Sequence, residues 1–384
     1  MKDILKLNEI SGLANKVFDG KFNFTEKSEN PIGIMLRSFN LHDFPLPDSL
    51  LAIARAGAGV NNIPVEECAE KGIVVFNTPG ANANAVKELT ICAILLASRK
   101  IAQGYVFAQS LKGSENVAKR AEKGKSAFVG PEIYGKKILV MGLGAIGSAV
   151  ANACVDLGME VSGYDPFISV DAAWRISRSV KHVTDLYQAL PNFDYITLHV
   201  PYTGENKGLV GKEFLGKTKD GVRIINLSRG ELCDNEEILE GTANGRISAY
   251  VTDFAKDELL GKDNIVVLPH LGASTPEAED NCAYNAAKAL CDYLENGNIK
   301  NSVNFPSLSK ERCGEIRITV IHKNVKSILS KITSAISESG ANIANLINSS
   351  RNEYAYTIVD CDDVEDGAIE RIRNIDGVIK VRKL

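Results

Sequence analysis

Several absences narrow the class of this 384-residue chain. Basic residues (44) and acidic residues (48) nearly balance, and the net charge of −4 gives no positive field for nucleic acid or an anionic membrane. The eight cysteines include no C-x-x-C pair, so we expect reduced thiols in a cytoplasmic protein, and we predict no metal site. The first ten residues carry charges and no sustained apolar region, so we expect no signal peptide.

One uncharged stretch, Ile138 to Val155, has the length of a membrane span. Its glycines, together with Ser148 and Asn152, favour a strand, a turn and a helix of a soluble protein instead. The sequence has no repeats or low-complexity segments, and its length predicts two or three domains.

The segment 136–166 predicts one βαβ unit. An apolar run, Ile138–Met141, precedes glycines in G-x-G-x-x-G spacing, and an amphipathic stretch and a second strand, Val161–Tyr164, follow. Further apolar runs predict strands at 195–200, 222–227, 249–251 and 265–268. Strands that alternate with helical stretches indicate a doubly wound parallel sheet of the Rossmann type.

The glycine motif predicts a dinucleotide site. Gly142 permits a tight turn, Gly144 lets a pyrophosphate approach the backbone, and Gly147 permits close packing of the helix. Asp165, 18 positions after Gly147, would accept hydrogen bonds from both ribose hydroxyls and repel a 2′-phosphate, so NAD is the predicted cofactor. The alternative is a glycine-rich turn that binds no ligand.

Three strand ends downstream carry polar side chains. Arg229 could bind a carboxylate, or form an ordinary surface salt bridge. The acidic stretch of Asp253, Asp257 and Glu258 could orient an imidazole, or be a solvated loop. His270, one of five histidines, could exchange a hydroxyl proton, or merely end a strand. Together the three meet the needs of 2-hydroxy acid oxidation by hydride transfer: a carboxylate clamp, a base, and an acid that tunes the base.

The flanking segments predict two further layers. Apolar runs at 32–36, 50–57 and 72–77 and a helix at 83–100 indicate a smaller α/β layer. From residue 315 the pattern reads β-α-β-β-α-β, a ferredoxin-like module that follows a linker at 301–314.

These motifs resemble those of the D-isomer-specific 2-hydroxyacid dehydrogenases. The resemblance covers nearly the whole chain and lies in "LRSF" (36–39), "RAGAGVNNIP" (55–64), "GLGAIG" (142–147), "NLSRG" (226–230) and "PHLGAST" (269–275). It implies three domains: a discontinuous flavodoxin-like substrate domain (1–98 and 283–304), a Rossmann NAD domain (99–282) and a C-terminal ACT domain (314–384). It also implies a cleft between the first two domains.

The resemblance assigns roles to single residues. It makes Arg229 and His270 catalytic, with Glu258, five positions after Asp253, as the acid; the chain reads D-F-A-K-D-E-L where the family has D-V-F-x-x-E-P, which leaves Asp257 as the alternative. The cofactor positions it implies are Gly142, Gly144, Ala145, Ile146, Gly147, Asp165, His199, Pro201, Asp253 and Gly272. The substrate positions are Arg37, Arg55, Ala58, Gly59 and Asn77, with Arg37 and Arg55 as phosphate contacts.

The implied activity is NAD-dependent oxidation of 3-phospho-D-glycerate, the first step of L-serine biosynthesis, in a homodimer or homotetramer. The alternatives are another D-2-hydroxy acid, such as glycerate or 2-hydroxyglutarate, or an NAD(H)-sensing regulatory protein. In the C-terminal module, His322, Asn324 and Asn342 match positions that contact serine, but Lys326 and Ser327 replace a proline and a glycine of the family loop. Losing that glycine removes backbone freedom, so serine binding stays open.

Overall fold

The computed structural model describes residues 1–170 and 172–384. Contacts between Cα atoms divide the chain into two compact units. Unit 1 is Met1–Ala81 with Glu279–Leu384, and unit 2 is Asn82–Ala278. The units divide before the helix α3 (Ala83–Ser98), which therefore belongs to unit 2 and not to the N-terminal layer. The domain boundaries expected from the sequence place α3 in the substrate domain instead, within residues 1–98, and those boundaries stay predictions.

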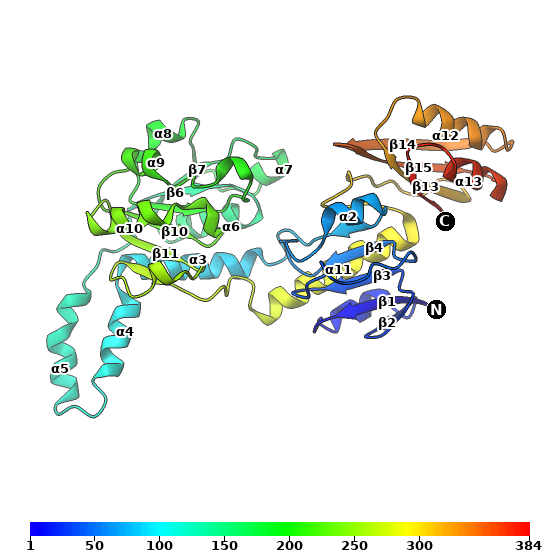
Figure 1. Ribbon diagram of the computed structural model, residues 1–384. Coiled ribbons are helices and arrows are strands. Elements are labelled where there is room, and N and C mark those ends of the chain that lie inside the picture. The colour runs from blue at the N-terminus through cyan, green and yellow to red at the C-terminus, as the bar shows by residue number, and fades with distance from the viewer. The chain divides into compact units, whose positions relative to one another are not determined.

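The N-terminal layer of unit 1 is a parallel sheet in the order β2-β1-β3-β4-β5, the flavodoxin-like order (Figure 1). Its three sequence-predicted strands are confirmed, and β1 and β2 are additional. The helix α11 (Pro276–Asn296) packs its alanines and Leu290 on one face, and α2 (Val65–Glu70) covers the other through Cys68. The other elements are β1 (Lys2–Leu7), α1 (Leu13–Phe18), β2 (Phe22–Thr25), β3 (Gly33–Leu36), β4 (Ala52–Arg55) and β5 (Val74–Phe76).

Unit 2 contains the predicted doubly wound sheet, in the order β12-β11-β10-β9-β6-β7-β8 with every pair parallel. The order reverses at β6, as in Rossmann folds. The strands are β6 (Lys137–Met141), β7 (Glu160–Tyr164), β8 (Lys181–His182), β9 (Tyr195–Leu198), β10 (Val222–Asn226), β11 (Ile247–Thr252) and β12 (Ile265–Val267). The helices around it are α6 (Ala145–Asp156), α7 (Val170–Ala173), α8 (Leu186–Ala189), α9 (Lys212–Lys217) and α10 (Asn235–Ala243).

The pattern of β6 explains why this sheet is buried on both faces. Ile138 and Val140 point into a cluster with α3 and α6, while Leu139 and Met141 point into the cluster on the other face. A strand that is buried on both faces is expected to be a continuous run of apolar residues, and Ile138–Met141 is such a run.

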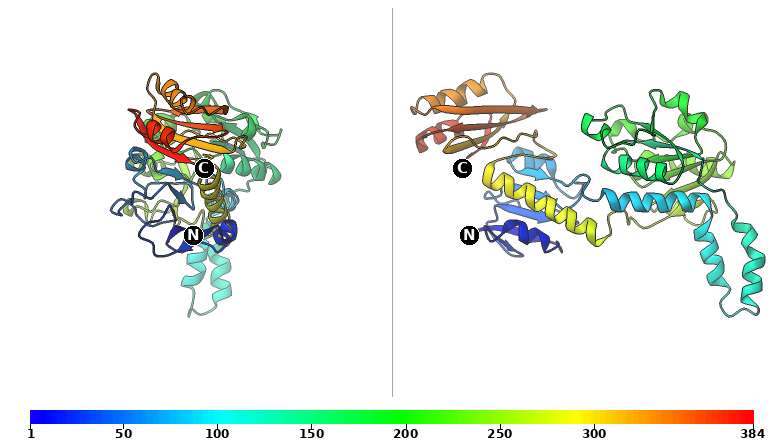
Figure 2. Two further views of the ribbon diagram at one scale, coloured as in Figure 1. Left: turned by 90° about the vertical axis from the view of Figure 1, so that its right-hand side faces the viewer. Right: turned by 180° about the vertical axis from the view of Figure 1, so that it is seen from behind.

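Two helices, α4 (Ile101–Ser110) and α5 (Val117–Gly124), form a hairpin that projects from the rest of unit 2 (Figures 1 and 2). Neither helix buries a side chain, and Tyr105 and Val106 are each 65% exposed. Among the described residues, no single helix is long and apolar enough to cross a membrane; α3 and α4 taken together pass that test of length and composition, but a 71° bend separates them.

The C-terminal part of unit 1 is the predicted β-α-β-β-α-β module, with an antiparallel sheet in the order β14-β15-β13-β16. Its elements are β13 (Ile316–Lys323), α12 (Ile328–Ser337), β14 (Ile343–Arg351), β15 (Tyr354–Cys361), α13 (Asp366–Arg373) and β16 (Val378–Lys383). Both helices cover one face of this sheet. The other face, including Ile321, Tyr356 and Ile358, shares a core cluster with α11 and the N-terminal sheet.

Candidate active site

The glycine turn between β6 and α6 has the shape that the sequence predicts. Gly142 has φ 86°, and a Cβ there would lie 2.6 Å from the carbonyl oxygen of His199. A Cβ on Gly147 would lie 1.8 Å from the carbonyl oxygen of Gly142, so only glycine lets α6 approach the turn this closely. A Cβ on Gly144 would meet nothing within 4 Å. The turn thus leaves open space at the N-terminus of a 12-residue helix, where backbone amides and the helix dipole favour a phosphate.

Asp165 follows β7 beside this turn. Its Oδ2 accepts a hydrogen bond from the amide of Leu143 at 2.8 Å, and its Oδ1 accepts one from the amide of Phe167 at 2.9 Å. The carboxylate therefore lies at the glycine turn, next to the start of α6, where Ala145 and Ile146 form the first turn. This is the arrangement that a ribose beside a pyrophosphate requires.

The other predicted cofactor residues line the same edge of the sheet. His199 follows β9; its Nε2 lies 3.0 Å from the Thr197 hydroxyl, and burial lowers the pKa of His199 to about 4, so the ring is neutral. The carbonyl of Pro201 accepts a hydrogen bond from Asn206. A Cβ on Gly272 would lie 3.3 Å from Val86 of α3.

Three neighbouring parallel strands bring two of the predicted catalytic residues, Arg229 and His270, to one edge together with Asp253, a predicted cofactor residue. Arg229 follows β10, Asp253 follows β11, and His270 follows β12. Because the carboxyl ends of parallel strands meet at one edge, their side chains converge. The Nη1 of Arg229 donates to the carbonyl of Ser228 at 2.6 Å, and this bond holds the guanidinium at the strand end.

His270 and Asp253 form an ion pair, with Nδ1 3.0 Å from Oδ2. The histidine side chain is 63% exposed, whereas that of Asp253 is only 1% exposed. The carboxylate raises the pKa of His270, and it outweighs the opposing effects of burial and Arg229. The ring of Phe254, 5.3 Å away between centroids, packs against the imidazole. Sequence reasoning missed Phe254, although an aromatic residue next to a strand-end carboxylate could have drawn attention to it.

Of the three acids that the sequence offers as partners of His270, only Asp253 pairs with it among the described residues; Glu258 and its alternative Asp257, to which the family pattern points, do not. Glu258 lies in a short 3-10 helix, Asp257–Leu259, and is exposed. Its Oε1 accepts a hydrogen bond from the amide nitrogen of Asn235 at 2.9 Å. A hydrogen bond to its own backbone, together with the bond from Asn235, lowers the pKa of Glu258. The catalytic role of Glu258 stays a prediction.

The predicted substrate residues of unit 1 cluster at the carboxyl ends of β3, β4 and β5. The Nε of Arg55 donates to the carbonyl of Arg37 at 3.0 Å, and Asn77 donates to the carbonyl of Ala58. Arg37 itself pairs with Glu279 in α11. The two arginines and the loop with Ala58 and Gly59 therefore lie together at these strand ends, and Glu279 balances the charge of Arg37.

A family model described as "D-isomer specific 2-hydroxyacid dehydrogenase, NAD binding domain" matches residues 91–272. The D-3-phosphoglycerate dehydrogenase of Escherichia coli strain K12 is 30% identical over 351 residues, which cover 88% of this chain and 82% of that protein. The chain belongs to the D-isomer specific 2-hydroxyacid dehydrogenases. The protein of the same name from Methanocaldococcus jannaschii is 35% identical over 308 residues, 79% of this chain. The chain spans about half the length of that relative and of the one from Bacillus subtilis, 56% and 53%.

Two solved structures of dehydrogenases share the fold. An NAD⁺-bound 3-phosphoglycerate dehydrogenase from Entamoeba histolytica has a TM-score of 0.59 at 25% identity, over 80% of this chain and 99% of that one. The apo D-mandelate dehydrogenase of Rhodotorula graminis has a TM-score of 0.68 at 19% identity, over 80% and 99%. Together with the family model, they confirm the Rossmann-like NAD-binding domain.

The residues predicted to contact serine, His322, Asn324 and Asn342, do not all lie close together within one C-terminal module. His322 is buried, with Nδ1 2.8 Å from the carbonyl of Lys323 and Nε2 2.9 Å from the Thr357 hydroxyl, and burial lowers its pKa. It pairs with Ala355 at one end of β15, while Ile343, next to Asn342, pairs with Cys361 at the other end. At about 3.3 Å per residue the two ends lie about 20 Å apart. Asn324 lies beside His322, where its side chain donates to the carbonyl of Asn352.

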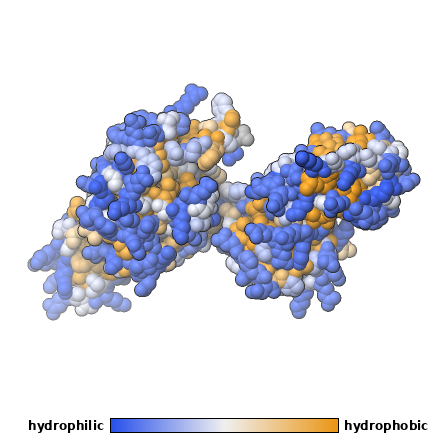
Figure 3. Space-filling model, turned by 45° about the horizontal axis from the view of Figure 1, so that its top comes forward, coloured by the Kyte–Doolittle hydropathy of each residue, from blue (hydrophilic) through white to orange (hydrophobic). Residues whose placement is uncertain are grey.

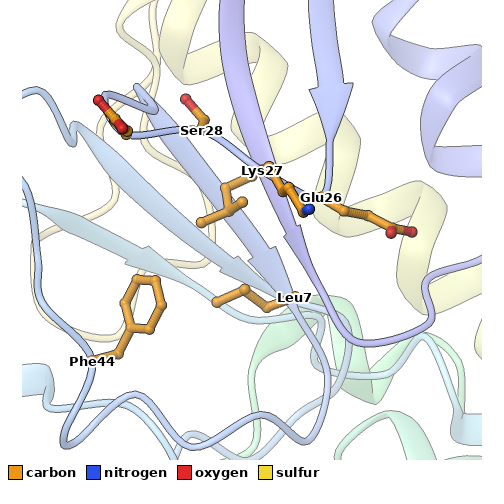
Figure 4. A pocket seen from close by; sticks show the side chains of 7 residues that line it. Leu7, Glu26, Lys27, Ser28 and Phe44 are labelled. Carbon is orange, nitrogen blue, oxygen red and sulfur yellow. The ribbon is translucent and has the colours of Figure 1, made fainter.

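Unit 1 also has a shallow pocket of about 440 Å³ beside β1 (Figure 4). Leu5, Leu7 and Phe44 form its apolar part, and residues 26–29 form its polar rim. Glu26 on that rim pairs with Lys6, and Ser28 donates to Asp3. None of the predicted substrate residues lines it.

Proposed function

We propose that this protein oxidises 3-phospho-D-glycerate to 3-phosphooxypyruvate with NAD, as the first step of L-serine biosynthesis. The observation that carries the proposal is the group of Arg229, Asp253 and His270 at one edge of an NAD-binding sheet. Relatives that are 30–37% identical bear the name D-3-phosphoglycerate dehydrogenase.

The chemistry follows from the residue types. The guanidinium of Arg229 binds the substrate carboxylate in a planar, charge-assisted pair and polarises C2. The free Nε2 of His270 accepts the proton of the C2 hydroxyl. NAD, when bound, accepts the hydride from C2. The glycine turn with Asp165 would hold its pyrophosphate and ribose.

Specificity for a phosphorylated substrate is assigned to Arg37 and Arg55. A dianionic phosphate needs two or more cationic donors, whereas glycerate needs none at that end. Replacing Arg37 with Met is expected to raise KM for 3-phosphoglycerate at least tenfold and to leave KM for NAD unchanged. Equal effects on 3-phosphoglycerate and on 2-hydroxyglutarate would favour another D-2-hydroxy acid as the substrate.

The decisive experiment follows NADH absorbance with phosphohydroxypyruvate and a panel of 2-oxo acids. We expect rapid NADH consumption by the wild type and a loss of roughly 10²-fold or more in kcat for His270→Gln, with NADH affinity retained. His182→Gln, at an exposed position on β8, is the matched control. Tight NADH binding without turnover of any acid would instead favour an NAD(H)-sensing protein.

We further propose a cytoplasmic homodimer that pairs through the α4–α5 hairpin. The exposed Tyr105 and Val106 on that hairpin belong to the apolar surface that a partner copy would cover. Apolar residues also interrupt the otherwise hydrophilic surface in Figure 3. Sedimentation should give a dimer for the wild type and a monomer for Tyr105→Glu. We also propose that the C-terminal module is an ACT domain. His322 and Asn342 could contact the same serine only if they came from two copies of the module. A variant that no longer dimerises should therefore lose inhibition by serine.

A further inference from the structure

Arg37, one of the two arginines assigned to the phosphate of the substrate, already pairs with a carboxylate of its own chain. Its Nη1 lies 2.5 Å from the Oε1 of Glu279, in the first turn of α11. The two side chains are 34% and 46% exposed, so water and a small anion can reach both of them. An anion that binds Arg37 must therefore displace this carboxylate or lie beside it, where like charges repel.

The backbone around Arg37 is held on both sides, so the arginine extends from a fixed base. Asn8 follows β1 with a left-handed backbone (φ 74°), and its Oδ1 accepts hydrogen bonds from the amides of residues 38 and 39. The carbonyl of Arg37 accepts one bond from the Nε of Arg55 at 3.0 Å and one from the Nδ2 of Asn62 at 3.3 Å. With the backbone fixed, the pairing with Glu279 sets the direction of the guanidinium.

Glu279 is held in place as well. The next residue, Asp280, accepts a hydrogen bond from the hydroxyl of Ser11, which ties the start of α11 to the loop after β1. Because both partners stand on fixed frames, the ion pair needs little further ordering, and the carboxylate stays close to the arginine.

The second arginine belongs to the same group of charges. Cys282, on the next turn of α11, is buried; burial raises the pKa of its thiol, which the charges of Arg37 and Arg55 lower and that of Glu279 raises. Two cations and one anion therefore lie around this thiol. A dianionic phosphate that arrives here meets two arginines, of which one is already neutralised.

We propose that Glu279 is a specificity-determining residue, an internal counter-ion of Arg37 that the phosphate of the substrate must displace. This inference rests on the proposed function, in which Arg37 and Arg55 receive that phosphate. Displacement opposes binding, so a ligand that offers only a phosphate binds weakly. A substrate whose carboxylate and hydroxyl are bound by other residues has the additional binding free energy that displacement requires. The enzyme thereby discriminates between its substrate and free inorganic phosphate.

The first test measures binding without turnover. Isothermal titration with inorganic phosphate is done on the full-length protein with saturating NADH, so that the glycine turn is occupied. We expect Glu279→Gln, which keeps the size of the side chain, to bind phosphate about three- to fivefold more tightly, the upper part of the range for exposed ion pairs. Glu277→Gln removes an exposed carboxylate two positions earlier on α11 and should bind phosphate as the wild type does. An equal gain in both variants would overturn the proposal.

The second test asks whether Glu279 acts through Arg37. In a double-mutant cycle, Glu279→Gln should no longer increase phosphate affinity once Arg37→Met is present. A gain that persists without the arginine would show that Glu279 repels phosphate from elsewhere and is not the counter-ion of Arg37.

The third test compares phosphohydroxypyruvate with hydroxypyruvate, two substrates that differ only in the phosphate group. Glu279→Gln should raise the ratio of their kcat/KM values about three- to fivefold in favour of the phosphorylated acid. A merely structural role would lower both values together and leave the ratio in place. A ratio that stays unchanged or falls would refute the role of Glu279 in specificity.

These measurements separate the inference from the proposed function. A wild type that reduces no 2-oxo acid, with phosphate binding that depends on Glu279 and Arg37 as described, would refute the proposed function and leave the counter-ion intact. A wild type that reduces phosphohydroxypyruvate, with phosphate affinity unchanged in Glu279→Gln, would do the reverse.

Discussion

At the scale of single residues, Gly144 and Gly147 of the glycine turn have different roles. Gly144 faces open space, while Gly147 touches the backbone of Gly142. We therefore expect Gly144→Ala to leave the free energy of unfolding within about 0.5 kcal/mol of the wild type, because an exposed helix cap tolerates a methyl group. It should nevertheless weaken NADH binding at least tenfold, since the methyl group occupies the approach of the pyrophosphate. Fluorescence titration and urea denaturation measure the two effects.

Gly147→Ala is the matched comparison, and it should lose both stability and binding. An unchanged NADH affinity in Gly144→Ala would mean that the dinucleotide does not approach this turn.

Ser327 stands where the family loop has a glycine, and its backbone is in a conformation that favours glycine. Its φ of 67° and ψ of 1° lie in the left-handed region, where a Cβ costs about 1 kcal/mol. Ser327→Gly should therefore stabilise the protein by up to about 1 kcal/mol. Ser334→Gly, in the exposed interior of α12, should instead destabilise it by about 0.5 kcal/mol. Urea denaturation of both variants checks this; a loss of stability in Ser327→Gly would contradict it.

His270 illustrates what residue-level reading of the sequence can and cannot reach. The strand-end positions of Arg229 and His270 followed from apolar runs and from the rule that parallel strands end at one edge. The choice among Asp253, Asp257 and Glu258 did not, because spacing along the chain does not say which carboxylate is buried. Counting along the family pattern selected Glu258, while the described ion pair is to Asp253.

At the scale of elements, apolar runs predicted the buried strands of the Rossmann sheet and the whole C-terminal module. The apolar patterns of the sequence did not predict β1, β2 or the α4–α5 hairpin. β1 mixes charged and apolar residues without regular alternation (KDILKL), and the hairpin buries no side chain, so neither shows the strong periodicity of a core element.

A buried ion pair joins two strands of the C-terminal module to the end of α11. Arg317 of β13 binds Asp360 of β15 through two bonds of 2.6 and 2.8 Å, and its Nη1 donates to the carbonyls of Asn296 and Lys310. Arg317→Met leaves a buried carboxylate unpaired and should cost about 3–5 kcal/mol of unfolding free energy. Adding Asp360→Leu should recover part of that loss. If the free energy of unfolding of Arg317→Met, measured by urea denaturation, lies within about 1 kcal/mol of the wild type, the ion pair does not stabilise the fold as proposed.

At the scale of the whole molecule, the sequence predicted the C-terminal module but not its packing against the N-terminal layer. A linker at 301–314 suggests a tethered domain, whereas one face of the module's sheet completes the core around α11. The contacts are specific: Arg382 donates to the carbonyls of Tyr293 and Leu294, and Tyr356 donates to that of Gly297. Long-range packing of this kind depends on which faces meet, and the local pattern of a sequence does not encode that.

Lys380 makes this packing sensitive to pH. Its Nζ donates to the carbonyl of Leu50 at 2.9 Å, and burial, aided by the charge of Arg382, lowers the pKa of Lys380 to about 8 from 10.5. Between these two values the unfolded chain binds more protons than the folded one, so this lysine makes stability rise with pH, by at most about 1.4 kcal/mol per pH unit.

The difference in unfolding free energy between wild type and Lys380→Met should therefore grow from pH 7.5 to 9.5, and urea denaturation across that range measures it. Lys326→Met removes the same charge from an exposed loop. A slope shared by both variants would assign the effect to net charge. A slope confined to Lys380→Met would locate it in the packing between the C-terminal module and the N-terminal layer, where loss of a single proton strengthens the fold of unit 1.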